Sequence, residues 1–174
     1  VYDFFKTKIK KQIFFVNNLE ASLLKEINTN CSKKNTLFIL ISKSGNTIET
    51  LSSINTLNKN VIDKKNAIVI TTNETNQLLN FAKSKKIKII NHRSYVSGRY
   101  SIFSETSLVP LYFMDIQISQ FRNIGQTFEK DNLVVMILTV NYFNLKNFIE
   151  MFDKNKTVED LHKIIIMSEY FKLD

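Results

Sequence analysis

The feature that most constrains the fold is an apolar strand that leads through a hydroxyl-rich turn into a helix. Residues 37–41 are five consecutive apolar residues, a run too short for a free-standing helix and typical of a strand buried on both faces. Residues 42–47 then read SKSGNT, and Ile48, Leu51 and Ile54 follow at helical spacing. This order of strand, turn and helix predicts a unit of a parallel α/β fold.

The turn after this strand is chemically suited to a phosphate group. Backbone N–H groups and the helix dipole favour an anion at the start of a helix, and serine and threonine hydroxyls add donors. Lys43 supplies a compensating positive charge. The spacing Gly-x-x-x-x-Gly-Lys-Ser/Thr of the nucleotide-triphosphate loop is missing, so the turn fits a single phosphate monoester. Asn46 and Glu49 are spaced to cap the helix that follows.

Two segments resemble the glucose-6-phosphate isomerase family, which has the sugar isomerase (SIS) fold. The first, residues 41–50, reads ISKSGNTIET and resembles the phosphate-binding loop of that family. The second, residues 96–104, reads VSGRYSIFS and is followed by SLVP at 107–110; it is similar to the family signature Val-Gly-Gly-Arg-Tyr/Phe-Ser. Ser97 and Ser107 stand where the family usually has glycine, which leaves every side chain with a chemical role in place.

The resemblance implies an aldose–ketose isomerase that interconverts glucose 6-phosphate and fructose 6-phosphate through an enediolate, without a metal or organic cofactor. Arg99 would stabilise the negative charge of the enediolate, and Gly98 would let the backbone approach the sugar. The phosphate of the hexose 6-phosphate would be held by Ser42, Lys43, Ser44 and Thr47, with Thr50 as a fifth member.

Two other functions remain open on the sequence alone. A regulatory SIS module would bind the same sugar phosphates without turnover, but it has no need for Arg99. Another SIS isomerase of hexose phosphates would share both segments, because the residues that select the substrate lie outside them.

Strands alternate with helices over the first part of the chain. This pattern predicts a parallel sheet covered by helices on both faces, followed by a helical segment. The resemblance implies that the sheet is a three-layer αβα sheet of the flavodoxin-like, SIS type. The expected strands are residues 12–16, 36–41, 67–71 and 87–90, and the expected helices are 18–28 (capped by Asn18), 47–58, 74–84, 104–115, 118–130 and 133–151. Residues 163–167 look like a further strand without a partner.

We expect three parts: residues 1–103 as an SIS domain whose N-terminal part is missing, 104–155 as a helical segment, and 156–174 as the truncated start of a second SIS domain. The resemblance implies a piece of a longer, homodimeric protein. Its catalytic glutamate and ring-opening histidine would follow Asp174, so the chain alone is expected to be inactive.

Composition excludes several other classes. The net charge of +8 comes without any nucleic-acid-binding motif, so we expect no nucleic acid partner. No apolar run reaches the ~20 residues that cross a membrane. The single cysteine, Cys31, fits a reducing cytoplasm and excludes an intramolecular disulfide. His92 is expected to be a solvated loop residue.

Overall fold

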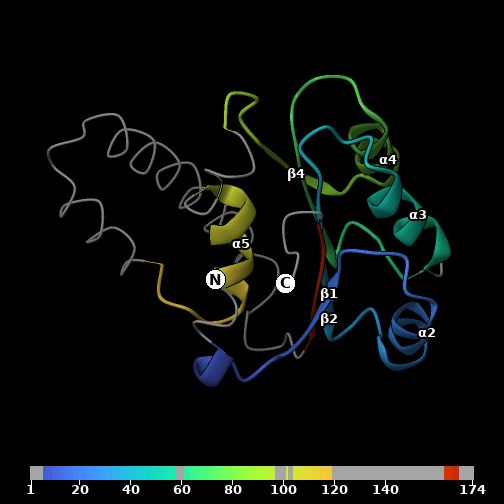
Figure 1. Ribbon diagram of the computed structural model, residues 1–174, viewed down its shortest axis with the longest axis vertical. Helices are drawn as coiled ribbons and strands as arrows, with labels where there is room; N and C mark the ends of the chain where they lie inside the picture. Colours follow the sequence, from blue (N-terminus) through green and yellow to red (C-terminus); the bar gives the residue numbers. More distant parts are fainter. Residues whose placement is uncertain (1–5, 58–60, 97–100, 102–103, 119–162, 169–174) are drawn as a thin grey trace, which may run out of the picture. The chain divides into compact units, whose positions relative to one another are not determined.

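The computed structural model describes residues 6–57, 61–96, 101, 104–118 and 163–168 (Figure 1). The chain forms two compact units. One comprises residues 1–10 and 96–158, and the other comprises residues 11–95 and 159–174. The second unit contains the sheet and residues 42–47, the turn that the sequence predicts to bind phosphate.

The sheet has five parallel strands in the order β1-β5-β2-β3-β4. All five lie close to the ranges expected from the sequence, which confirms the parallel α/β class. Their bounds are β1 (Gln12–Val16), β2 (Thr36–Ile41), β3 (Ala67–Thr71), β4 (Lys88–Asn91) and β5 (Lys163–Ser168).

Strand β5 corrects one expectation. It lies between β1 and β2, where Phe14 and Phe38 both pair with Ile165, so the prediction of a strand without a partner is wrong. The local pattern identified a strand but carried no information about pairing, because parallel partners are far apart in the sequence. The strand belongs to the first sheet and does not begin a new one. The predicted helical segment 104–155 stays a prediction beyond the described residues.

Three helices follow the first three strands and pack on one face of the sheet (Figure 1). They are α2 (Ala21–Asn30), α3 (Ile48–Thr56) and α4 (Gln77–Lys85). Alternate residues of the strands meet them in one apolar core: Phe14, Val16, Phe38, Leu40, Ala67 and Val69 from the sheet, and Leu24, Ile27, Ile54, Leu78 and Ala82 from the helices. Burial of each large apolar side chain stabilises the fold by roughly 1.5–3 kcal/mol.

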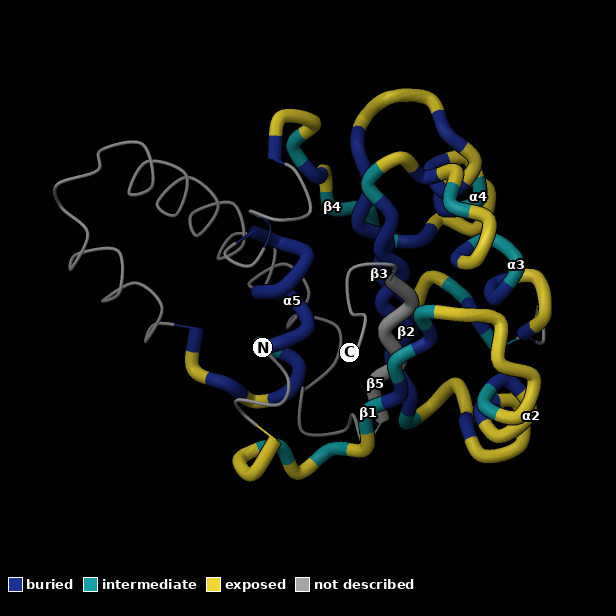
Figure 2. The backbone as a smooth tube through the Cα atoms, viewed as in Figure 1, coloured by how far each residue is buried: buried dark blue, intermediate teal, exposed yellow. Residues whose placement is uncertain are grey.

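Strands β2 and β3 are buried along their whole length (Figure 2). Leu37, Ile39 and Ile41 point away from the helix-facing set, yet each is at most 1% exposed. Because β2 is buried on both faces, all five residues 37–41 are apolar. A strand with one exposed face would instead alternate apolar and polar residues.

The helix starts differ from the predictions by a few residues. Helix α2 is preceded by Glu20 as its N-cap, so the expected cap at Asn18 is wrong. Helix α4 begins at Gln77 and not at residue 74, because the Asn76 side chain accepts a hydrogen bond from the Leu79 N–H at 2.7 Å. A short polar turn therefore separates β3 from α4.

The described part of the other unit contains a 3-10 turn, η1 (Lys6–Lys8), and helix α5 (Glu105–Phe113). Ser104 precedes α5, and its hydroxyl donates to the Ser101 carbonyl at 2.7 Å. The predicted helix at 104–115 is thus confirmed, whereas the one at 133–151, and all of the one at 118–130 except Ile118, lie outside the described residues. No described helix is long and apolar enough to cross a membrane.

Candidate phosphate-binding site

The candidate site is the turn of residues 42–47, which we call the phosphate loop, between the end of β2 and the start of α3. The Ser42 hydroxyl lies 2.8 Å from that of Thr47, and the Ser44 hydroxyl lies 3.4 Å from it. Ser42 is buried, whereas Ser44 is exposed. The structure therefore brings together three of the predicted residues, with their hydroxyls converging at the carboxyl edge of a parallel sheet. Ligands bind at this edge in such folds.

Gly45 allows the phosphate loop to turn tightly. Its φ is +65°, a left-handed conformation that glycine adopts cheaply. Its N–H donates to the Ser42 hydroxyl at 3.0 Å, which folds the loop over that side chain. A Cβ atom added at Gly45 would lie 1.9 Å from Oδ1 of Asn76. Both the backbone and the space therefore require glycine.

Two further predicted residues flank these hydroxyls. The Lys43 carbonyl accepts from the Thr72 N–H at 3.4 Å and from the Thr71 hydroxyl at 3.5 Å, and its side chain is half-buried. Thr50 lies in the first turn of α3 and is only 3% exposed. Phosphate contacts by Lys43 and Thr50, like those by the three hydroxyl residues above, stay predictions.

The start of α3 is not capped as expected. Thr47 is its N-cap residue, and the Thr47 side chain makes no cap hydrogen bond to the helix. The predicted Asn46–Glu49 pair is wrong, because Oδ1 of Asn46 instead accepts from the Gln77 N–H of α4 at 3.0 Å. The first N–H groups of a helix have no partner within it, so this uncapped start favours an anion beside the hydroxyls.

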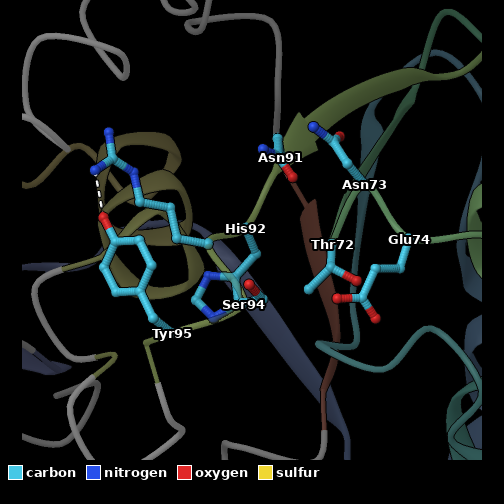
Figure 3. Close-up of a pocket in the computed structure, with 8 residues that line it drawn as sticks. Thr72, Asn73, Glu74, Asn91, His92, Ser94 and Tyr95 are labelled. Atoms are coloured by element: carbon cyan, nitrogen blue, oxygen red, sulfur yellow. Dashed lines mark hydrogen bonds between the residues drawn. The ribbon is translucent and has the colours of Figure 1, made fainter.

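A cavity of about 340 Å³ lies between the ends of β3 and β4 (Figure 3). Its lining residues are Thr72, Asn73, Glu74, Asn91, His92, Arg93, Ser94 and Tyr95. His92 is only 1% exposed, so the expectation of a solvated histidine is wrong. The Arg93 guanidinium donates to the Tyr95 hydroxyl and lies 5.8 Å from the centre of its ring.

Sequence reasoning did not select Thr72, Asn73 or Glu74. These three residues could have been found from their position directly after β3, because this places them at the same sheet edge as the phosphate loop. Gly98 and Arg99, the other predicted site residues, lie outside the described residues, and their roles stay predictions. Within the described ranges, no group of three His, Cys, Asp or Glu residues is placed to hold a metal ion.

The fold and the phosphate loop define a parallel α/β domain with a hydroxyl-lined turn before a helix. A crystal structure of a hypothetical protein from Thermus thermophilus shares this fold, with a TM-score of 0.56 and 19% sequence identity. The match covers 71% of this chain and 37% of that one. The sequence matches the phosphoglucose isomerase family over residues 1–172, and the chain therefore belongs to this family.

Two relatives illustrate how much of a family member the chain covers. The glucose-6-phosphate isomerase of Prochlorococcus marinus strain MIT 9515 is 36% identical over 115 residues, which are 62% of this chain and 22% of that protein. The glucose-6-phosphate isomerase of Methanocaldococcus jannaschii is 31% identical over 125 residues, which are 67% of this chain and 30% of the relative. The chain thus spans less than a third of the length of either relative.

Proposed function

We propose that this chain takes part in the interconversion of glucose 6-phosphate and fructose 6-phosphate by holding the substrate's phosphate in the phosphate loop. The observation that carries the proposal is the convergence of the Ser42, Ser44 and Thr47 hydroxyls at the uncapped start of α3. Membership of the phosphoglucose isomerase family and the names of the relatives support the same reaction.

The phosphate group is remote from C1 and C2 of the sugar, the carbons between which the proton moves. Binding energy gained at the phosphate positions those carbons for reaction, and it raises the rate where that positioning is completed in the transition state. Lys43 at the edge of the loop lowers the electrostatic cost of bringing a dianion to the protein.

The remaining parts of the proposal come from the resemblance. Arg99 stabilises the enediolate, and the backbone at Gly98 approaches the sugar. The complete protein acts without a metal or organic cofactor as a cytoplasmic homodimer of the SIS type.

The proposal is tested by titrating the chain with fructose 6-phosphate and, separately, with fructose. We expect amide chemical-shift changes in residues 42–50 with the phosphate ester only. Replacing Ser44 and Thr47 together by alanine should abolish these changes. The Thr56→Ala variant is the control, because Thr56 is an exposed residue at the far end of α3 that donates only to the Ser52 carbonyl. Equal responses to the two sugars would refute the proposal.

A further inference from the structure

The phosphate loop is held from behind by the segment that joins β3 to α4, residues 71–79, which we call the β3–α4 segment. The Leu78 N–H donates to the Gly45 carbonyl at 2.9 Å, and the Thr72 N–H donates to the Lys43 carbonyl at 3.4 Å. In a third bond between the segment and the loop, the Gln77 N–H donates to Oδ1 of Asn46 at 3.0 Å. Three residues of the loop are thus tied to a neighbouring βα unit.

These bonds set the direction of the loop's N–H groups. In a trans peptide the C=O and the following N–H point in opposite directions. When the Lys43 and Gly45 carbonyls face the β3–α4 segment, the next N–H groups, those of Ser44 and Asn46, face away from it. The Asn46 N–H indeed donates to the Ser44 hydroxyl at 3.3 Å, on the side of the hydroxyl cluster, and the Ser44 N–H faces the same side.

Asn76 is at the centre of the β3–α4 segment. Its side-chain N–H₂ group donates to the Glu74 carbonyl at 2.8 Å, to the Thr71 hydroxyl at 3.3 Å and to the Thr72 carbonyl at 3.4 Å. Its Oδ1 caps α4 at Leu79. The residue is only 5% exposed. One amide therefore fixes the turn after β3 as well as the start of α4.

The Asn76 amide also lies directly against the phosphate loop. No side-chain atom fits between it and Gly45, as the 1.9 Å approach of a built Cβ demonstrates. A shift of this amide towards the loop would therefore meet the backbone at Gly45, because close-packed groups have little room to move independently.

We propose that Asn76 is a positioning residue for the binding of a phosphate monoester. By holding the β3–α4 segment, it makes the loop present the Ser44 N–H group together with its three hydroxyls. Asn76 does not itself touch the ligand. The identity of the ligand rests on the proposed function, whereas the control of the loop's conformation by Asn76 does not.

The test separates positioning from simple helix capping. Asn76→Ser keeps a side-chain oxygen that can cap α4 and removes the amide that holds the turn. Asn80→Ser makes the same chemical change at an exposed position one turn later in α4 and serves as the control. Affinity for fructose 6-phosphate, melting temperature and amide hydrogen exchange in the ligand-free chain are measured for both variants.

We expect Asn76→Ser to weaken fructose 6-phosphate binding about tenfold, the effect of losing one buried hydrogen-bonded group. The Gln77 and Leu78 amides, which bond the loop, should exchange faster, while the Ala82 amide within α4 should not. Asn80→Ser should change none of these quantities. If Asn76→Ser does not fold, Asn76→Asp, which also caps α4, is compared by hydrogen exchange alone.

Two results would overturn the positioning role: unchanged exchange at Gln77 and Leu78, or faster exchange along all of α4, which indicates only a lost cap. A wild-type chain that fails to bind fructose 6-phosphate would refute the proposed function instead. The exchange at Gln77 and Leu78 would then still decide whether Asn76 controls the loop.

Discussion

Helices α3 and α4 begin at the same edge of the sheet but use their N-termini differently. In α4, the first three N–H groups are bonded to Asn46, to Gly45 and to the cap residue Asn76. In α3, the N-cap residue Thr47 makes no side-chain cap bond, and its hydroxyl instead lies 2.8 Å from that of Ser42. The start of α4 is thus bonded within the protein, and the start of α3 is the one at which we propose that the phosphate binds.

This difference distinguishes the start of α3, where we propose that the phosphate binds, from the start of α4. A helix N-terminus binds an anion only when its N–H groups are not already bonded. The first N–H groups of α4 are already bonded within the protein, so they do not bind an anion. Two of these bonds fix the loop that precedes α3. Three predictions test this division, from the largest expected effect to the smallest.

Gly45→Ala should have the largest effect because it breaks the contact between the two helix starts. The added methyl group meets the Asn76 amide, and alanine at a φ of +65° is strained. We expect the free energy of unfolding to fall by roughly 2–4 kcal/mol, and phosphate binding to be lost with the loop's shape. Urea denaturation measures the first effect and titration the second. Wild-type values in both would refute the packing described for Gly45.

Thr47→Asp converts the α3 start into a capped start like that of α4. Aspartate is a better N-cap than threonine and interacts favourably with the helix dipole. Stability should therefore rise slightly, by about 0.5 kcal/mol, while fructose 6-phosphate binding should be lost through charge repulsion. Thr47→Asn provides a neutral cap as the control. Binding retained by the aspartate variant would mean that the phosphate is bound elsewhere.

The smallest effect is expected from a substitution of Asp63. This residue lies in the turn before β3, at the opposite edge of the sheet. Burial raises the pKa of its carboxyl group, but hydrogen bonds from the Lys65 N–H at 2.8 Å and from Lys33 at 3.2 Å outweigh this, and the pKa is lowered from 3.8. Folding therefore favours the ionised form. Its contribution to stability is present above pH 3.8 and is lost as the pH falls through the lowered pKa.

We therefore expect Asp63→Asn to make the melting temperature less sensitive to acid below about pH 4. The same variant should bind fructose 6-phosphate as the wild type does at pH 7, because the turn lies away from the ligand edge. Altered binding at neutral pH would contradict the assignment of the ligand site to the carboxyl edge alone.

The sequence predicted the strands well because each is a short apolar run with polar residues at both ends. Strands β1, β2 and β3 have the expected bounds. The phosphate loop was equally accessible, since the residues that form it are consecutive and its chemistry depends on local order. The convergence of Ser42, Ser44 and Thr47 follows from one tight turn.

Pairings between distant parts of the chain were not accessible. Asn46 was expected to cap its own helix, yet it bonds α4, because the alignment of β2 with β3 brings Gln77 close to it. Local sequence does not encode that alignment. For the same reason, the role of Asn76 and the partners of β5 could not be predicted from the local sequence.

The place of β5 has a consequence for how the protein is made. Strands β1 and β2 are joined through a strand that is synthesised more than a hundred residues after them. During translation the early strands leave the ribosome with a gap between them, and their exposed edges are open to wrong pairing. The sheet is completed only after β5 has been synthesised. Contacts between residues that are far apart in the sequence also make folding slow.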